Sequence, residues 1–393
     1  MDILLTLALI LPFMRGMRKP LTAAAFLAAI LVSIESGHLI ASFFFGLSLL
    51  VLWLSSWPAE KYPLFFLAMF DLIGILQSSN LLELFVYFEL AIYASYFLIL
   101  EKRDLRAVFR YFVVNSVGSA LMLFSIAIEY YTTGSLTALT GGALVFFTLG
   151  LLIKLGIAPF QDWLVEIYRT ASLSSILFFS AILTEISPLA LLIIIQEPSP
   201  VLQAFAMFSM FIANAMALTE NSTKRILALM DASNLAYLLL AIAMASPGSR
   251  TAALYMMFCH VLAMSFAFTA LVVSGSLDIH DLRAPRGLEL PFYASFFALS
   301  GLPPFHLFPS KILLFSSVFS ASQPVSYFLL FNLILNALVA LRILSSIQGS
   351  EEKKVNKKFR AFLYGVFILS VALGLFPKPF FEFVNSQMFL FTR

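Results

Sequence analysis

Apolar stretches separated by short polar, glycine or proline breaks run along the whole chain. A helix crosses the hydrocarbon core of a bilayer in about 20 residues, and most of the stretches approach that length. The pattern predicts an all-α polytopic membrane protein with about fourteen transmembrane helices; because the first two stretches are short, thirteen is the alternative. The predicted helices cover residues 3–14, 20–34, 38–56, 62–78, 80–100, 106–130, 142–158, 172–195, 200–218, 224–245, 251–274, 291–319, 324–346 and 360–377.

Lysines and arginines are distributed unevenly among the loops that join these helices. Nineteen of the 24 lie in, or at the helix ends beside, the first, third and later odd-numbered loops. Arg250, Lys378 and Arg393 lie in even loops or at the C-terminus, and Lys154 and Lys311 lie within predicted helices. Because loops rich in lysine and arginine stay in the cytoplasm, we expect the odd loops inside, both termini outside and an even number of helices.

Composition supports the membrane class and narrows the chemistry. Hydrophobic residues make up 61% of the 393 residues and charged residues 11%, whereas a soluble domain has about 45–50% and about 25%. The single cysteine, Cys259, excludes disulfides within the chain and thiolate-ligated zinc or iron–sulfur sites. No glycine-rich nucleotide loop is present. We therefore expect no cofactor, no metal site and no nucleic-acid partner, and we assign any redox chemistry to partner chains.

Two predicted helices are interrupted in the same way. Lys154-Leu-Gly-Ile-Ala-Pro159 ends the seventh, and Gly301-Leu-Pro-Pro-Phe305 interrupts the twelfth ahead of Lys311. Either proline alone indicates a kink, but a break beside a buried lysine, twice and five helices apart, indicates an inverted repeat with discontinuous helices 7 and 12. The predicted organisation is N-terminal helices in 1–56, a first five-helix repeat in 57–197, a second, inverted repeat in 198–346, and a basic loop with the last helix in 347–393.

Glu89 and Lys154 fall at matched depth in the fifth and seventh predicted helices. A charge at the bilayer centre costs about 2.5–3.5 kcal/mol on insertion scales, so such residues are usually paired or functional. The structural interpretation is an ion pair that fixes the register of the two helices. In the functional interpretation, two effects on the lysine oppose each other: burial favours the neutral amine, and the nearby carboxylate favours the ammonium. Such a lysine can hold or release a proton as its partner moves.

Five further ionisable residues within predicted helices are candidates for function. Glu185 in the eighth and Lys311 in the twelfth extend an alternation of negative and positive groups along the chain. His260 in the eleventh is either a relay between them, because histidine titrates nearest to neutral pH, or a helix-packing residue. Asp231, two turns into the tenth, is either a hydrated entry residue or an interfacial one. Asp71 in the fourth is a further candidate.

Four motifs follow one another in an order that resembles one family. They are Glu89 followed seven residues later by Tyr96, Lys154 running into Pro159-Phe-Gln-Asp-Trp-Leu164, Lys224-Arg225-Ile-Leu-Ala228, and Gly301-Leu-Pro-Pro-Phe-His-Leu-Phe-Pro-Ser-Lys311. From about the fourth predicted helix to the fourteenth, the chain resembles the antiporter-like, proton-translocating membrane subunits of respiratory complex I, of Mrp-type cation/proton antiporters and of related membrane-bound hydrogenase and sulfur-reductase complexes.

The resemblance implies fourteen helices with two inverted five-helix repeats, membrane-subunit partners and translocation of H⁺ or Na⁺ in the cytoplasmic membrane of a prokaryote. It implies that Glu89 and Lys154 modulate proton loading, that Lys311 is the terminal releasing site, and that His260 belongs to a central hydrated axis. Combined with the buried charges, the expected ion path comprises Glu89, Lys154, Glu185, Asp231, His260 and Lys311.

The chain also departs from the family pattern. Gln161 stands in place of a loop histidine, and Ala171 and Leu173 stand in place of two prolines, which puts the break before the eighth helix in doubt. Glu185 stands in place of the central lysine, and Met264 in place of a lysine that many members carry. These changes motivate an alternative, a degenerate structural subunit without transport of its own. A standalone transporter for an organic solute is a third hypothesis, for which the sequence offers no evident substrate pocket.

Overall fold

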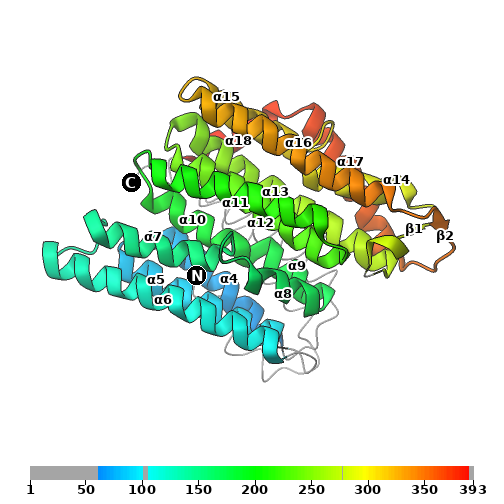
Figure 1. Ribbon diagram of the computed structural model, residues 1–393. Helices are drawn as coiled ribbons and strands as arrows, with labels where there is room; N and C mark the ends of the chain where they lie inside the picture. The colour runs from blue at the N-terminus through cyan, green and yellow to red at the C-terminus, as the bar shows by residue number, and fades with distance from the viewer. Residues whose placement is uncertain (1–60, 101–104, 277, 389–393) are drawn as a thin grey trace. The chain divides into compact units, whose positions relative to one another are not determined.

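The computed structural model (Figure 1) describes most of the chain from residue 61 onward, in the ranges 61–100, 105–276 and 278–388. The predicted helices in the first 56 residues lie outside these ranges. Elsewhere helices dominate, and their contacts divide the chain into two compact units. The division falls at the helix break after Lys154, because α7 belongs to unit 1 while the segment Gly156–Arg169 belongs to unit 2.

Unit 1 contains the chain up to Leu155 and the segment Thr170–Ile194. Within it α6 packs on α7, α4 on α5, and α10 on both α7 and α4. A π-helical turn at Phe179–Leu183 interrupts the helix predicted at 172–195, directly before the helix that carries Glu185. The helices of unit 1 are α4 (Tyr62–Gln77), α5 (Leu81–Ile99), α6 (Leu105–Thr133), α7 (Gly141–Leu155), α9 (Leu173–Phe178) and α10 (Thr184–Ile194).

Unit 2 is built around α12 and α13, whose most apolar windows are 100% and 94% buried. Two short helices, α8 and α18, are absent from the sequence prediction. The helices of unit 2 are α8 (Asp162–Thr170, all but its last residue), α11 (Pro200–Thr219), α12 (Thr223–Ala243), α13 (Pro247–Ser274), a 3₁₀ turn (Ile279–Asp281), α14 (Glu289–Ser300), α15 (Leu307–Phe319), α16 (Gln323–Ser345), α17 (Lys357–Leu375) and α18 (Lys378–Ser386). Its two short strands, β1 (Ala284–Pro285) and β2 (Ser350–Glu351), pair in parallel.

Both predicted helix breaks are present, and each begins at a glycine. α7 ends before Gly156 (φ 70°), where a Cβ atom would lie 2.8 Å from Trp163 Cζ2. α14 ends before Gly301 (φ 74°), where a Cβ atom would lie 2.7 Å from Lys311 Cε. The left-handed backbone favours glycine at both positions, and at Gly156 the Trp163 ring also leaves little room for a side chain. The seventh and twelfth predicted helices are therefore discontinuous.

The break before the eighth predicted helix, in doubt from the sequence, is also present. The chain leaves the helical conformation between α8 and α9 without the family's prolines. Ser172 takes their place as the N-cap of α9, where its side chain accepts a hydrogen bond from the Ser175 amide. Side-chain capping of this kind satisfies amides that the first helical turn leaves free. A capping serine can therefore begin a new helix at this point without a proline.

In unit 1, contacts join odd-numbered loops to odd-numbered loops and even-numbered loops to even-numbered loops. Lys61 Nζ donates to the Leu98 carbonyl at 2.5 Å, which joins the third and fifth loops. The Leu81 amide donates to the Leu136 carbonyl at 2.8 Å, which joins the fourth and sixth. Successive helices that cross a membrane must alternate in direction, and these contacts agree with that alternation.

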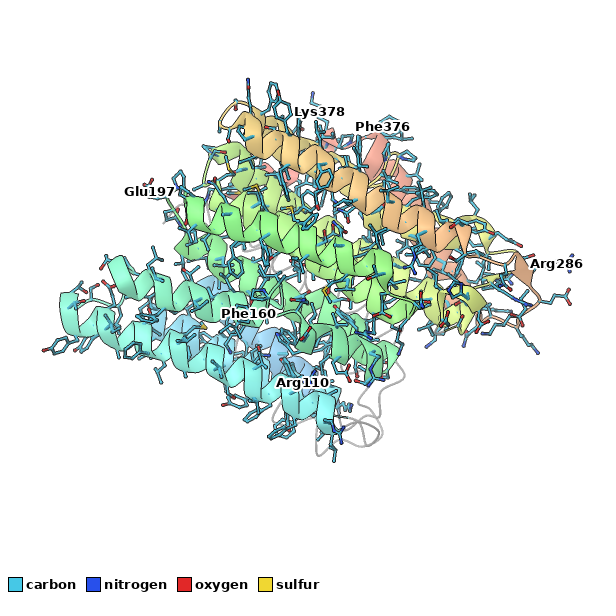
Figure 2. All side chains as sticks on the ribbon, viewed as in Figure 1. Arg110, Phe160, Glu197, Arg286, Phe376 and Lys378 are labelled. Atoms are coloured by element: carbon cyan, nitrogen blue, oxygen red, sulfur yellow. The ribbon has the colours of Figure 1, made fainter. Side chains whose placement is uncertain are left out.

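Unit 2 follows the same rule. The β1–β2 pairing joins the eleventh and thirteenth loops, and the Ser199 amide donates to the Ala243 carbonyl at 2.9 Å, which joins the eighth and tenth. Figure 2 shows Arg286, from an odd loop, and Glu197, from an even loop, at opposite ends of the unit. The odd loops of unit 2 therefore share one end of its helices and the even loops share the other.

Seven helices in the described part of the chain are long and apolar enough to cross a membrane: α5, α6, α11, α12, α13, α16 and α17. The outer helices carry large exposed apolar side chains, among them Phe109, Val117 and Ile368. Water would not tolerate such continuous apolar surface, whereas lipid or another membrane subunit does. The chain is a polytopic α-helical membrane protein.

Candidate functional site

Glu89 and Lys154 form the ion pair that the sequence predicts, in unit 1. Lys154 Nζ lies 2.9 Å from Glu89 Oε1, and the two side chains are 0% and 13% exposed. The Ser119 hydroxyl lies between them, 2.7 Å from Lys154 Nζ, from which it accepts, and 2.7 Å from Glu89 Oε2, to which it donates. Lys154 also lies in the last turn of α7, where the helix dipole favours a cation. The ammonium is thus compensated by a carboxylate, a hydroxyl and a helix end.

A close approach of α6 and α7 positions this pair. A Cβ atom at Gly150 would lie 2.6 Å from the Gly118 carbonyl oxygen. A Cβ atom at Gly118 would lie 2.8 Å from the Gly150 carbonyl and 3.1 Å from Lys154 Cγ. Neither helix therefore has room for a side chain at the crossing. Since α6 also carries Ser119, the two glycines bring Lys154 within hydrogen-bond distance of that hydroxyl.

Gly150→Ala should destabilise unit 1, because the added methyl group must push α6 away from α7; overpacking of this kind costs about 1–3 kcal/mol. Gly142→Ala is the matched control on the same helix, since a Cβ atom there would meet nothing within 4 Å. We expect the control to be neutral or to stabilise by up to about 1 kcal/mol. Thermal unfolding of the purified protein in detergent compares the two, and equal losses would contradict the close-approach argument.

Glu185 and Asp71 are the other buried carboxylates of unit 1 that the sequence singles out, and both are 0% exposed. Glu185 lies in the first turn of α10, directly after the π-helical turn, and α10 packs against the helix that carries Lys154. π-Helical turns are rare and recur at functional sites. Among the residues that the structure describes, neither carboxylate oxygen of Asp71 has a hydrogen-bond partner. The described part of unit 1 thus places Glu89, Glu185, Asp71 and Lys154 within its apolar helices.

In unit 2 the structure brings together Asp231 and His260 and adds a residue that the sequence reasoning missed, Tyr168. His260 Nε2 lies 2.8 Å from Asp231 Oδ1, and the Tyr168 hydroxyl donates to Asp231 Oδ2 at 2.5 Å. Asp231, His260 and Tyr168 are each 0% exposed, and the Tyr168 ring stacks on Phe268. Asp231 and His260 are therefore buried partners of one another.

Lys311 lies in α15 and reaches back to the end of α14. Its Nζ donates to the Ser300 carbonyl at 3.0 Å, one of the carbonyls that the helix break leaves without an intrahelical partner. The ammonium also lies 4.3 Å from the centre of the Tyr237 ring, a cation–π contact. Within the described ranges, no carboxylate forms an ion pair with Lys311. Lys311 is thus held by a helix end and a ring face, and Lys154 by a carboxylate.

His306, in the break between α14 and α15, is a second candidate that the sequence reasoning missed. Its ring is fully buried, with Nε2 2.9 Å from the Cys259 carbonyl oxygen and Nδ1 2.5 Å from Ser370 Oγ. Because a carbonyl oxygen only accepts, Nε2 carries the hydrogen, and the neutral ring accepts from the Ser370 hydroxyl at Nδ1. His306 therefore ties the Lys311 break to α13 and α17. Its place within the quoted glycine–proline motif is the sequence signal that marks it.

Gln161, which stands in place of a loop histidine, is buried in the break after α7. Its Nε2 donates to Met216 Sδ at 3.3 Å. An amide does not titrate, so this position takes no part in proton transfer through its own side chain. Asp231, His260, His306 and Lys311 are among the buried ionisable side chains of unit 2.

The chain is similar in sequence to a family of known proteins. Residues 78–336 match the family described as NADH:quinone oxidoreductase/Mrp antiporter, TM. Subunit N of the F420H2 dehydrogenase of Methanosarcina mazei is 29% identical, over 82% of this chain and 76% of that protein. The match contains the Glu89 and Lys154 helices, the Asp231–His260 pair and the Lys311 break.

Solved structures agree on the fold. A chain of the membrane-bound sulfane sulfur reductase, an archaeal respiratory membrane complex, superposes with a TM-score of 0.88 at 18% identity, over 100% of this chain and 96% of that one. A chain of respiratory complex I from Thermus thermophilus superposes with a TM-score of 0.84 at 24% identity, over 97% and 98%. The matched region covers well over half of the sequence. The chain belongs to the NADH:quinone oxidoreductase/Mrp antiporter family of antiporter-like membrane subunits.

Proposed function

We propose that the chain translocates protons across the membrane as one subunit of a larger, redox-driven complex. The observation that carries the proposal is the burial of ionisable groups within apolar helices, where each charge costs about 2.5–3.5 kcal/mol. Packing alone gives no reason for them, because a buried ion pair is often no more stable than apolar side chains of the same volume. The proposed path comprises Glu89, Lys154, Glu185, Asp231, His260 and Lys311, of which all but Glu89 are at most 4% exposed.

In unit 1 the proposed step is proton transfer between Lys154 and its oxygen partners. The Ser119 hydroxyl accepts from the ammonium and donates to Glu89, so it offers a route for a proton from nitrogen to carboxylate. When the proton moves, both partners become neutral, and the pair gives up its attraction and its desolvation penalty together. Glu185 supplies a second buried carboxylate in the same unit.

In unit 2 the proposed carriers are the Asp231–His260 pair and Lys311. Protonation of His260 places an imidazolium beside the Asp231 carboxylate, and Tyr168 holds the second oxygen of that carboxylate in place. Lys311 has a carbonyl and a ring face as its neighbours, which stabilise an ammonium less than a carboxylate would. Lys311 is therefore proposed as the site that gives up its proton. Nitrogen bases at three of the six positions support H⁺ over Na⁺, because hard cations take oxygen ligands.

The remaining proposals concern the partners of the chain, its orientation in the membrane and its internal repeats. One relative is a subunit of a dehydrogenase, and we propose that the redox partner of this chain is of a similar kind. We also propose that other membrane subunits and lipid cover the exposed apolar faces. The sorting of odd and even loops supports the proposal that the basic odd loops face the cytoplasm and that both termini face outward in the cell membrane. The two glycine breaks support an organisation in two inverted five-helix repeats, spanning 57–197 and 198–346.

The alternative is a structural subunit without transport, and Lys311→Met separates the two. If Lys311 releases protons, the variant should assemble, sustain electron transfer and pump clearly fewer protons per electron in membrane vesicles. Lys378→Met is the matched control, since the Lys378 side chain is 85% exposed on α18, and it should pump normally. A Lys311→Met complex with the wild-type proton stoichiometry would favour the structural subunit.

A further inference from the structure

A group of buried polar side chains in unit 2 lies next to Lys311 and takes no part in the path described above. We call it the asparagine cluster: Asn214 of α11, Tyr237 of α12, and Asn332 and Asn336 of α16. All four side chains are at most 2% exposed. The cluster reaches Lys311 through Tyr237, whose ring lies beneath the ammonium.

One end of the cluster is directly hydrogen-bonded. Asn214 Nδ2 donates to Asn332 Oδ1 at 3.0 Å and to the Ser233 hydroxyl at 3.0 Å. These bonds use both hydrogens of one amide and tie α11 to α12 and α16. This end is fixed by protein contacts alone.

Other atoms of the cluster, including one on each of Asn214 and Asn332, have no such bond in the part of the chain that the structure describes. Within the residues that the structure describes, five buried polar atoms of the cluster have no hydrogen-bond partner, namely Asn214 Oδ1, Tyr237 Oη, Asn332 Nδ2, Asn336 Nδ2 and Asn336 Oδ1. Asn332 and Asn336 also lie close enough to the Tyr237 hydroxyl to interact with it. Buried donors and acceptors are almost always satisfied, by protein or by ordered water. Five such atoms in one place therefore indicate a ligand.

The chemistry of these atoms identifies the ligand. The cluster offers both amide donors and amide acceptors around a hydroxyl, which suits a molecule that donates and accepts, and suits a bare cation or anion less well. A small cavity of about 20 Å³ is lined by Lys311, by Tyr237 of the cluster and by apolar side chains of α15 and α16. A single water needs a cavity of at least about 10–15 Å³ and two to four polar partners. There is room for one water at this end of the cluster, where Lys311 and Tyr237 are its polar neighbours.

We propose that the asparagine cluster binds water and forms a hydrated branch from Asn214 to Lys311, by which protons reach Lys311. Asn214 lies five residues before the end of α11, and that end joins an odd loop. The branch therefore runs from Lys311 towards the end of unit 2 where the odd loops gather. The Asp231–His260 pair joins α12 to α13, whereas the cluster lies on α11, α12 and α16. The inference rests on the proposed proton translocation and assigns to it an entry route.

Asn336→Leu and Tyr237→Phe test the branch, because they remove only atoms that have no direct hydrogen bond in the structure. If the cluster is dry packing, both variants should be neutral or stabilising and should pump normally. If it is a hydrated branch, both should lower the protons pumped per electron in vesicles of the assembled complex by several-fold, and Asn336→Ser, which keeps a water ligand, should restore most of the loss.

Lys311→Met, measured in the same vesicles, distinguishes failure of the hydrated branch from failure of the proposed proton translocation. Loss of pumping in Lys311→Met with normal pumping in Asn336→Leu and Tyr237→Phe would overturn the branch and leave the proposed function standing. Normal pumping in Lys311→Met would overturn both. Cryo-electron microscopy of the wild-type complex, at a resolution that shows ordered water, gives an answer independent of folding of the variants. We expect water density within hydrogen-bond distance of Asn336 and Tyr237, and a dry, directly bonded cluster would overturn the branch.

Discussion

Replacing Lys154 by methionine should abolish most of the proton translocation that depends on this chain, while the complex still assembles. The variant leaves Glu89 buried beside Ser119 without a cation, and breaking a buried pair by removing one partner costs about 3–5 kcal/mol. Thermal unfolding in detergent should therefore show a clear loss of stability, and vesicle measurements should show fewer protons per electron. Glu89→Gln should lower pumping in the same way.

The double variant Glu89→Gln with Lys154→Met separates stability from transport. With both charges gone, nothing is left uncompensated, and replacement of a whole buried pair is often close to neutral. Stability should therefore recover most of the loss seen in Lys154→Met, whereas pumping should stay low. Recovery of both together would mean that the pair serves the packing of α5 against α7 and has no role in transport.

Asp231→Asn should also remove pumping, with a smaller loss of stability. The amide keeps an oxygen that accepts from Tyr168, but it removes the charge beside His260. Hydrogen bonds to charged groups are worth about 1.5–3 kcal/mol, which sets the expected loss in the free energy of unfolding. The histidine then loses the partner that stabilises its protonated form, so proton loading in unit 2 should fail.

Tyr168→Phe provides the control for that variant. It removes the hydroxyl that bonds Asp231 Oδ2 and keeps both the ring, which stacks on Phe268, and the Asp231–His260 contact. We expect a similar cost in stability and a much smaller effect on the proton stoichiometry. If Tyr168→Phe abolished pumping as completely as Asp231→Asn, the tyrosine would itself carry protons, and the role assigned to it here would be wrong.

Features that depend on local sequence were predicted well. In the described part of the chain, each long apolar stretch is helical, although the eighth and twelfth are interrupted, because the hydropathy of about 20 consecutive residues decides whether a segment enters the bilayer. The breaks at Gly156 and Gly301 followed from glycine and proline next to lysine. The contact between Glu89 and Lys154 could be expected because two opposite charges at matched depth in lipid offset each other's desolvation.

Features that depend on tertiary contacts were missed. The nine-residue α8 is too short and too polar to register as a span, so the role of Tyr168 at Asp231 was invisible. Ser119 and Asn336 are ordinary polar residues in apolar helices, and only the packing of other helices against them gives them a function. The π-helical turn before Glu185 has no signature in composition, because the same residues would also continue an α-helix.

The proton stoichiometry of the Glu89→Gln, Lys154→Met double variant, measured in vesicles of the assembled complex during electron transfer, decides whether buried charge in this chain moves protons. The proposal predicts a stable complex that transfers electrons and pumps fewer protons per electron than the wild type. An unchanged stoichiometry in that stable complex would contradict it and leave the Glu89–Lys154 pair as a structural contact between two helices.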